Sequence, residues 1–562
     1  MTKTKYKTKQ AVTNKVYYRH PKNIECILCG SRLECIGTNH RQLTNLEEKS
    51  KVTIQIRRCR NKACSNHKSN LKPISYQHQI VFGSSYGIDV HGLIGHMRLA
   101  HRQTVPEIHQ ELTQGYAHIE IGERHVENIV NQLSLCIEQS GKNANHLRDY
   151  FSEQSGLVLS IDGVEPEKGH NILYIVREVI SGKILFAHYA TYTDAVHLKA
   201  EILLPLKRVL EQAALPVLGW IADKELAIGA AVQEVFKEVP FQHCQAHFLA
   251  AMKSPLTKAD TQLGKSVKKN FGKIKPIERA IDRSYQADEL ELVEKEQLQT
   301  LCMTIRNWLN TSMSHKYRFK GLELYESMEQ ILQLISVLRQ HKEHSVLEQL
   351  QKSLKDSLAD LRIEQQALKQ GQNILDQLTD LLYGAKNEKK IRPTQEHKEQ
   401  FTAQQIQQKV EDLLSQNHKQ YKGHSSQMRG YLRHFQLVYD NWKEHLFTCY
   451  DYSYLPNDNN RIELSHSQVK KQYRRITGQK STAKYLKIHG EQAPFLLAYT
   501  YGNNSEKDLI DLIRNTDQQQ LKQQKKEQLK KSQQRAKNTP TKKRLKKTLQ
   551  NIKELWCQNN NS

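Results

Sequence analysis

Long apolar stretches are missing from this chain of 562 residues. No run approaches the roughly twenty apolar residues that a membrane-spanning helix needs, so a membrane protein of that kind is not expected. The first ten residues, MTKTKYKTKQ, also lack the apolar segment of a secretory signal. We therefore expect a protein that works in a reducing cytoplasm, without a membrane partner.

Proline is absent between Pro276 and Pro393, which excludes the breaks that end helices in most chains. Leucines recur there at steps of three and four residues, the spacing of one helical face. One such stripe comprises Leu347, Leu350, Leu354, Leu358 and Leu361. Residues 256–450 are therefore predicted to be an all-helical insertion, and the stripe is interpreted as its core.

Acidic residues are scarce, because 59 Asp and Glu stand against 84 Lys and Arg and leave a net charge of +25. Such a surplus favours a polyanionic partner through counterion release, and nucleic acid is the commonest one. Ribosomal and merely soluble proteins share a basic balance, so the charge alone does not decide. Residues 503–562 are expected to be a flexible basic tail that binds phosphates without sequence preference.

Of the ten cysteines, five lie in the first 64 residues. The pairs CILC and CRNKAC supply Cys26, Cys29, Cys59 and Cys64. Paired cysteines in a reducing compartment favour a metal site, and four thiolates bind one tetrahedral zinc ion. Residues 1–75 are thus predicted to be a zinc ribbon with a structural Zn²⁺. Because the second pair has a wider spacing than the first, Cys35 and His67 remain alternative ligands.

Two helical patterns separated by a glycine-containing break follow within residues 76–150. TVPEIHQEL has an N-cap and an early proline, and IGERHVENIVNQL has apolar residues at helical spacing. This arrangement suggests a helix-turn-helix domain whose second helix enters a DNA major groove. The groove-facing candidates are Arg124, His125 and Asn128. An ordinary helical hairpin is an equally good interpretation.

Residues 151–255 alternate between strand and helix in the order strand, strand, strand, helix, strand, helix, strand. GLVLSIDG leads to Asp162, and PVLGWIAD, the fourth strand, leads to Asp223. Runs this apolar are typical of strands covered on both faces. A carboxylate at the end of such a strand projects from the sheet edge where α/β folds bind ligands.

A third acid heads a basic helix after the insertion. The stretch PNDNNRIELSHSQVKKQYRRI places Glu463 on the same helical face as Lys470 and Arg474. We expect the carboxylate to bind a metal ion and Lys470, Arg474 and Arg475 to bind DNA. A solvated helix whose first-turn acid complements the helix dipole is the alternative. Residues 451–502 would complete the α/β core.

Clustered carboxylates repel one another unless a cation neutralises them, and oxygen ligands suit Mg²⁺ or Mn²⁺. A pair of such ions activates the attacking oxygen and stabilises the leaving oxygen in phosphoryl transfer. Three further acids lie near the chosen ones, namely Glu165, Glu225 and Asp458. They rank lower, and Asp458 is interpreted as a turn or cap residue.

The order of these motifs resembles the catalytic core of DDE transposases of the ribonuclease H-like fold, and within them the Mutator-like group and related bacterial insertion-sequence enzymes. Those proteins carry a helical insertion before the glutamate, an Asn-rich segment ahead of it, and a Cys-x-x-His pair after the second aspartate. HCQAHF supplies that pair as Cys244 and His247. The likeness covers about residues 156–500.

The resemblance implies a multidomain α/β protein with a ribonuclease H-like mixed sheet. It also implies that two Mg²⁺ or Mn²⁺ ions bind to Asp162, Asp223 and Glu463, and that Cys244 and His247 have a structural role beside them. The implied function is strand cleavage and strand transfer on element terminal repeats and target DNA, by a nucleoid-associated homo-oligomer. An inactive DNA-binding regulator and a non-joining nuclease of the same fold are the alternatives.

Overall fold

The computed structural model describes most of the chain. The described residues are 13–17, 25–71, 80–81, 83–165, 171–271, 274–313, 318–384, 400–421, 423–459, 471, 490–501, 505–516, 521, 523–527, 530, 549–550 and 552–553. In that part of the chain, no helix is both long enough and apolar enough to cross a bilayer.

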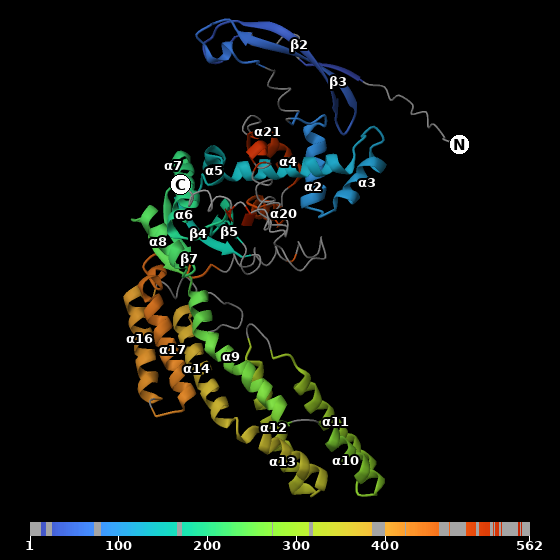
Figure 1. Cartoon of the computed structure of the whole chain (residues 1–562), viewed down its shortest axis with the longest axis vertical. Coiled ribbons are helices and arrows are strands. Elements are labelled where there is room, and N and C mark those ends of the chain that lie inside the picture. Colours follow the sequence, from blue (N-terminus) through green and yellow to red (C-terminus); the bar gives the residue numbers. More distant parts are fainter. Residues whose placement is uncertain are drawn as a thin grey trace, which may run out of the picture. The chain divides into compact units, whose positions relative to one another are not determined.

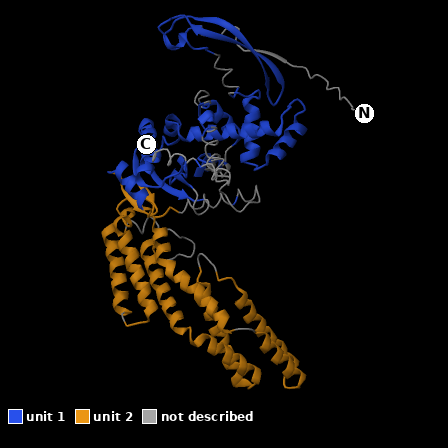
Figure 2. Ribbon diagram, in the orientation of Figure 1, with its two compact units in different colours: residues 1–218, 226–237, 460–562 blue, residues 219–225, 238–459 orange. Residues whose placement is uncertain are grey.

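The chain divides into two compact units (Figure 2). Unit 1 comprises residues 1–218, 226–237 and 460–562, and unit 2 comprises residues 219–225 and 238–459. Each unit is therefore assembled from more than one segment of the sequence, and in unit 1 the last segment is far from the others.

Unit 1 begins with a three-stranded sheet in the order β1-β3-β2. Figure 1 labels its two longer strands, β2 and β3. Its strands are β1 (Thr13–Tyr17), β2 (Leu33–Thr44) and β3 (Lys49–Cys59), and the short helix η1 (Ser65–His67) follows. β2 and β3 form an antiparallel hairpin, whereas β1 runs parallel to β3. Among the described residues, the apolar cluster of this hairpin comprises Leu43, Val52 and Ile54, with Ile80 packed against it. A core this small needs additional stabilisation, for which a metal ion is one common source.

A helical layer follows the hairpin. It contains α2 (Ile88–Leu99), α3 (Val105–Gly115), α4 (Glu123–Gly141) and α5 (Ala144–Tyr150). Helices α2, α3 and α4 share one apolar cluster that includes Ile94, Ile108 and Val126. The predicted N-cap of α3 is present at Thr104, which also forms a reciprocal capping box with Glu107. Helix α4 is longer than predicted, because its apolar side chains continue past Leu133 to Ile137.

A five-stranded mixed sheet follows, in the order β6-β5-β4-β7-β8. Its strands are β4 (Leu157–Val164), β5 (Ile172–Glu178), β6 (Ile184–Ala190), β7 (Val217–Ala222) and β8 (Phe241–His243). β4, β5 and β6 pair antiparallel, and β7 pairs parallel with β8. The strands occur in the predicted order, and the coarse prediction of a mixed α/β fold is confirmed. The boundary between the two units falls inside β7.

The helices between the strands also follow the predicted order. They are α6 (Ala195–Leu198), the π-helical η2 (Lys199–Leu203), α7 (Leu204–Ala213) and α8 (Leu226–Val235). The Asp194 side chain accepts hydrogen bonds from the backbone N–H groups of Val196 and His197, at 3.1 and 3.2 Å. Asp194 is thus the N-cap of α6, and it satisfies two donors that a helix start otherwise leaves unpaired.

Two helices from the C-terminal part of the sequence complete unit 1. They are α20 (Gln492–Tyr501) and α21 (Glu506–Arg514). Phe495 of α20 belongs to an apolar cluster with Leu173 and Ile175 of β5, so α20 covers part of the sheet. Ile513 of α21 packs into the cluster of the helical layer. Leu521 is buried against Leu135 and Cys136. Residues 503–562 were predicted to be a flexible tail, and this is wrong for α21 and Leu521, whose apolar side chains pack against other parts of unit 1.

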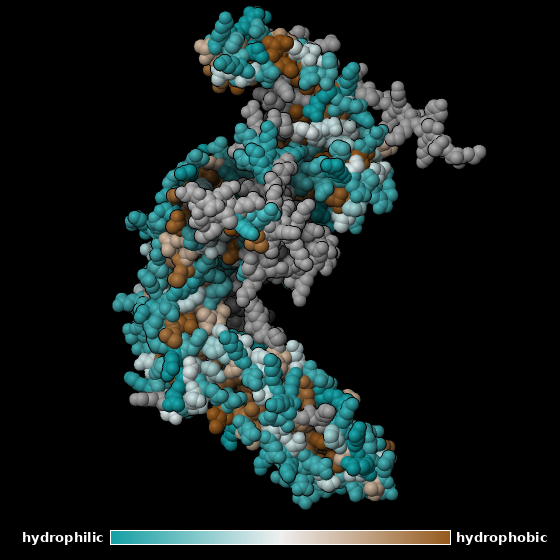
Figure 3. Space-filling model, in the orientation of Figure 1, coloured by the Kyte–Doolittle hydropathy of each residue, from teal (hydrophilic) through white to brown (hydrophobic). Residues whose placement is uncertain are grey.

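Unit 2 is mainly helical. Its helices are α9 (Gln245–Phe271), α10 (Lys275–Gln286), α11 (Leu292–Asn310), α12 (Lys320–His341), α13 (Ser345–Ala359), α14 (Arg362–Tyr383), α16 (Ala403–Gln420) and α17 (Ser426–Trp442), with the short η3 (Lys443–His445) and η4 (Thr448–Tyr450). All five leucines of the predicted stripe, from Leu347 to Leu361, are buried. On the face drawn in Figure 3, hydrophilic residues cover most of these helices. The stripe is therefore core, as predicted.

Helices α9 and α12 approach one another closely at Gly321. A Cβ atom placed on Gly321 would lie 1.9 Å from the backbone oxygen of Asp260, so only glycine fits there. The Asp260 carboxylate accepts hydrogen bonds from the N–H groups of Gly321 and Leu322, at 3.1 and 2.8 Å. Asp260 thus caps the neighbouring helix α12 from within α9.

Candidate functional site

The four predicted zinc ligands come together in unit 1. Cys26 and Cys29 lie in the turn before β2, Cys59 ends β3, and Cys64 precedes η1. Their sulfur atoms all lie within 4.8 Å of one another, with Cys26 and Cys64 separated by 3.8 Å and Cys29 and Cys59 by 3.4 Å. Sulfurs about 3.8 Å apart are what tetrahedral zinc with Zn–S bonds of roughly 2.3 Å requires. The cluster fits a zinc ion.

Polar groups around the cluster orient and stabilise the thiols. Asn66 Nδ2 donates to Cys26 Sγ at 3.4 Å and holds the pKa of that thiol below its usual range. Hydrogen bonds from Ser31 lower the pKa of Cys29 to about 6. Burial, by contrast, raises the pKa of Cys59 to about 12. A cation would therefore be needed to hold all four as thiolates.

The two alternative ligands lie outside the described cysteine cluster. Cys35 is exposed, and its thiol donates to the carbonyl of Gly37 at 3.6 Å. His67 Nδ1 donates to the carbonyl oxygen of Cys59 at 2.7 Å. His67 thus hydrogen-bonds to the backbone of Cys59 and is not one of the four clustered ligand residues.

The three groove-facing candidates lie in the first two turns of α4. Arg124, His125 and Asn128 are all exposed, whereas Val126 and Ile129 face the apolar cluster. Tyr86 packs edge-on against His125 with ring centroids 6.2 Å apart. The start of α4 therefore presents polar side chains on its outer side. The second half of the helix is buried.

Asp162 and Asp223 belong to neighbouring strands of the sheet. Asp162 is half-buried and lies within β4, where it pairs with Ile175; the strand continues to Val164, two residues beyond the predicted end. Asp223 directly follows the last residue of β7. Of the lower-ranked acids, Glu165 is exposed and Glu225 is half-buried.

Within unit 2, Asp223 lies in a corner with Cys244 and His247. The register of β7 and β8 pairs Ala222 with His243, and the Cys244 N–H donates to the Ala222 carbonyl at 2.9 Å. Residues Asp223 and Cys244 are therefore held at the same end of these two strands. His247 lies in the first turn of α9, and its Nδ1 is 2.7 Å from Asp223 Oδ1. Ligand atoms of all three side chains lie within 4.8 Å of one another.

The electrostatics of this corner favour a charged histidine in the metal-free state. Burial lowers the pKa of His247, but hydrogen bonds with Asp223 and Cys244 outweigh burial and raise it to about 11. The imidazolium then balances the Asp223 carboxylate. Cys244 is fully buried, whereas the side chains of Asp223 and His247 are each 28% exposed to solvent.

The segment just before Glu463 packs against the same corner. Asn457, Asp458 and Asn459 are buried, with exposed fractions of 4, 6 and 3%. The Asn457 carbonyl accepts from the Gln245 N–H at 2.8 Å, and the Asn459 N–H donates to Cys244 Sγ at 3.3 Å. The interpretation of Asp458 as a turn or cap residue stays a prediction, because the residues that follow Asn459 lie outside the described part of the chain. After burial, Asp458 is the largest cause of a raised pKa at Tyr383.

Two buried glutamines fix the loop behind this segment. Gln242 Nε2 donates to the Leu446 carbonyl at 2.7 Å, and Gln242 Oε1 accepts from the Cys449 N–H at 2.8 Å. Gln245 Nε2 donates to the same Leu446 carbonyl at 2.9 Å. Neither glutamine was singled out from the sequence, although Gln245 lies inside the Cys-x-x-His motif and Gln242 lies two residues before it. These hydrogen bonds hold residues 446–449 against the residues around Cys244.

Glu463, Lys470, Arg474 and Arg475 lie outside the described residues. The predictions for these four residues therefore stay predictions.

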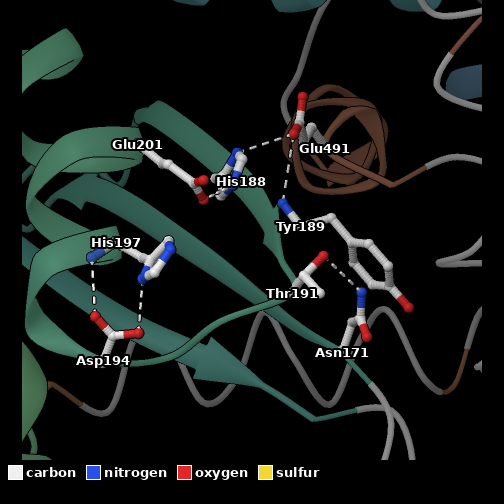
Figure 4. A network of polar contacts seen from close by, with 8 residues as sticks. All are labelled: Asn171, His188, Tyr189, Thr191, Asp194, His197, Glu201 and Glu491. Atoms are coloured by element: carbon white, nitrogen blue, oxygen red, sulfur yellow. Dashed lines mark hydrogen bonds and ion pairs between the residues drawn. The ribbon is translucent and has the colours of Figure 1, made fainter. Parts of the chain in front are cut away.

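A second polar network lies in unit 1 and was not predicted (Figure 4). His188 of β6 lies between two carboxylates, with Nε2 2.8 Å from Glu201 of η2 and Nδ1 3.1 Å from Glu491, which precedes α20. The Tyr189 N–H also donates to Glu491, at 3.5 Å. Because both ring nitrogens face carboxylates, His188 is better suited to tying β6, η2 and α20 together than to binding a metal. The signal in the sequence was a histidine within the otherwise mostly apolar strand ILFAHYA, because such a polar side chain needs a hydrogen-bonding partner.

Comparison with known proteins yields no identification: no protein-family model matches the chain, and no curated protein matches it.

Proposed function

We propose that this protein is a DDE transposase, which binds the ends of a mobile element and catalyses metal-dependent cleavage and transfer of DNA strands. The observation that carries the proposal is the placement of Asp162 within the first strand, and of Asp223 directly after the fourth strand, of a sheet in which those two strands are neighbours. The antiparallel β4-β5-β6 meander, continued by the parallel pair β7-β8, supports a ribonuclease H-like core.

The direction of the two strands adds support. The Leu157 N–H at the start of β4 donates to the carbonyl of Pro216, the residue before β7, at 2.9 Å. Neighbouring strands that begin together run the same way, so their aspartates lie toward one edge of the sheet. Acids at that edge are suited to ligand binding in α/β folds.

The chain between the insertion and Glu463 also fits the proposal. Asn457–Asn459 is packed against Cys244 and Gln245, beside Asp223. Glu463 comes four positions after Asn459 in the sequence, and such a segment spans at most about 14 Å. Glu463 is thus within reach of the corner by chain length alone.

Asp162 and Asp223 each offer carboxylate oxygens, the ligand type that Mg²⁺ and Mn²⁺ prefer, and each side chain is partly accessible. When bound, two Mg²⁺ or Mn²⁺ ions would activate the attacking oxygen and stabilise the leaving oxygen of the phosphodiester. His247 would hold the Asp223 carboxylate in one orientation. The exposed start of α4, the ribbon and the basic C-terminal segment would bind the DNA.

The test is a strand-transfer assay with the full-length protein, Mg²⁺ and DNA from the sequences that flank its gene. Nicking that leaves a 3′-hydroxyl, followed by joining of pre-cleaved ends to target DNA, is the expected result. Hydrolysis without joined product would favour a nuclease. DNA binding without cleavage under Mg²⁺ or Mn²⁺ would favour a regulator.

A further inference from the structure

We propose that Asp223, Cys244 and His247 form a second, separate site for Zn²⁺ or a similar transition metal, distinct from the cysteine cluster of the ribbon. One carboxylate, one thiol and one imidazole converge within 4.8 Å, all inside unit 2. The site itself does not depend on the proposed function, because it rests only on these three side chains and their surroundings.

The chemistry of the donors selects the metal. Sulfur and imidazole nitrogen are ligands that Zn²⁺, Co²⁺ and Cu²⁺ prefer, whereas Mg²⁺ binds oxygen almost exclusively. Three protein ligands leave one position of a tetrahedral zinc ion for water, as in open zinc sites. A cation would also replace the proton that the close contact between His247 and Asp223 now requires.

The surroundings hold the ligands in place before any metal arrives. Cys244 is fixed by the bond from its N–H to Ala222, and its sulfur accepts a hydrogen bond from the Asn459 N–H. Backbone N–H donors to a sulfur are a typical outer-shell feature of metal-bound thiolates. Because Cys244 is buried and Asp223 and His247 are partly exposed, a metal ion has an entry path from the side of the latter two.

Zinc in this corner would have a consequence for the proposed function. Asp223 is also a ligand of the proposed magnesium pair, so the two kinds of metal would compete for one carboxylate. Zinc would then inhibit strand transfer reversibly, and a chelator followed by fresh Mg²⁺ would restore it. This consequence rests on the proposed function, whereas the binding site does not.

The experiment uses Co²⁺ as the probe on the full-length protein with Zn²⁺ already in the ribbon cluster. One additional Co²⁺ per chain is expected, with the near-ultraviolet charge-transfer band of a single thiolate ligand. Cys244→Ser should abolish that band, and Asp223→Asn should weaken Co²⁺ binding at least about tenfold. The matched control is Cys302→Ser, which alters another buried cysteine of the same unit and should leave the band unchanged.

Several outcomes would overturn the proposal. One is a Co²⁺ signal that disappears only in Cys29→Ser. Another is a charge-transfer band that survives in Cys244→Ser. A third is a wild-type protein that binds no metal ion beyond the one in the ribbon cluster. If Cys244→Ser misfolds, Asp223→Asn decides, because that change is isosteric and lies at a partly exposed position. X-ray absorption of the Co²⁺-loaded wild-type protein, with one sulfur among nitrogen and oxygen ligands expected, gives a readout independent of any variant. If the wild-type protein binds Co²⁺ at this site but shows no strand transfer, that result counts against the proposed function and leaves the metal site in place.

Discussion

His247 Nδ1 lies 2.7 Å from Asp223 Oδ1, across a gap of more than twenty residues in the sequence. The contact depends on the pairing of β7 with β8, which brings the residues after both strands to one place. The contact with His247 orients the Asp223 carboxylate. The sequence alone shows only that Asp223 is an acid at the end of a strand. Asp223 is for this reason the residue on which a test of catalysis should concentrate.

Asp223→Asn is expected to abolish DNA cleavage and strand transfer, by about two orders of magnitude or more, because a neutral amide is a poor ligand for Mg²⁺. DNA binding, measured by filter retention or fluorescence anisotropy, should not change. Glu165→Gln is the matched control, since it removes an exposed acid close to Asp162 in the sequence. Equal activity of the two variants would contradict the proposed role of Asp223.

Cys29→Ser should release zinc from the ribbon cluster and unfold residues 25–71, because the apolar core of the hairpin is small. Elemental analysis should detect one zinc ion fewer per chain, and amide exchange of β2 and β3 should accelerate. Cys35→Ser, at the exposed cysteine outside the cluster, is the control and should leave both quantities unchanged. An unaltered zinc content in Cys29→Ser would disprove the site.

What the sequence could predict was decided by local signals. The strands around Asp162 and Asp223 are continuous apolar runs, and the zinc cluster has paired cysteines at short spacing, so both were visible without a structure. The buried leucine stripe from Leu347 to Leu361 follows the same logic, because a repeat of three and four residues specifies one face of a helix.

What it could not predict depends on contacts between distant segments. The asparagines of the PNDNN stretch suit a solvated turn by composition, yet Asn457 and Asn459 are buried because Gln245 and Cys244 supply their hydrogen-bond partners. The tie between His188, Glu201 and Glu491 likewise joins residues about three hundred positions apart. No local pattern encodes such pairings, since each partner alone resembles an ordinary surface residue.

Arg124→Ala at the start of α4 should weaken binding of DNA that carries the terminal repeats. If Arg124 contacts a phosphate, the slope of log affinity against log salt should fall by about one, since one counterion fewer is released. If it contacts a base instead, discrimination between specific and random DNA should fall by about 1–3 kcal/mol. Arg429→Ala removes an exposed arginine from α17 in the helical unit and serves as the charge control. Identical behaviour of both variants would place the DNA interface elsewhere.

His91 should make the helical layer sensitive to acid. Its side chain is buried in α2, Nδ1 donates to the Gly87 carbonyl at 2.9 Å, and Nε2 has no hydrogen-bond partner among the described residues. Burial lowers its pKa from 6.5 to about 4. Between these two values the unfolded chain binds a proton that the folded one does not, so stability is lost as the pH falls from 7 toward 4.

The expected loss between pH 7 and pH 5 is roughly 2 kcal/mol, which follows from 1.36 kcal/mol for each unit of pKa difference traversed. Amide exchange in α2, corrected for the intrinsic effect of pH, would measure it. His91→Asn is the informative variant, because the amide keeps a donor for Gly87 but does not titrate. In His91→Asn, the protection of the α2 amides from exchange should depend less on pH than in the wild type. An equal pH dependence in both proteins would show that His91 does not cause the loss of stability in acid.

The contact between α9 and α12 yields the last prediction, on Gly321. Gly321→Ala would push a methyl group against the Asp260 backbone and force the two helices apart, which would also lengthen the hydrogen bonds that cap α12. Overpacking at a rigid backbone contact costs about 1–3 kcal/mol or more. Gly430→Ala is the matched control, because a Cβ there meets nothing within 4 Å and alanine favours helix by up to about 1 kcal/mol. Thermal unfolding should therefore shift down for Gly321→Ala and stay level or rise for Gly430→Ala; the opposite order would show that the helices are not held together at this point.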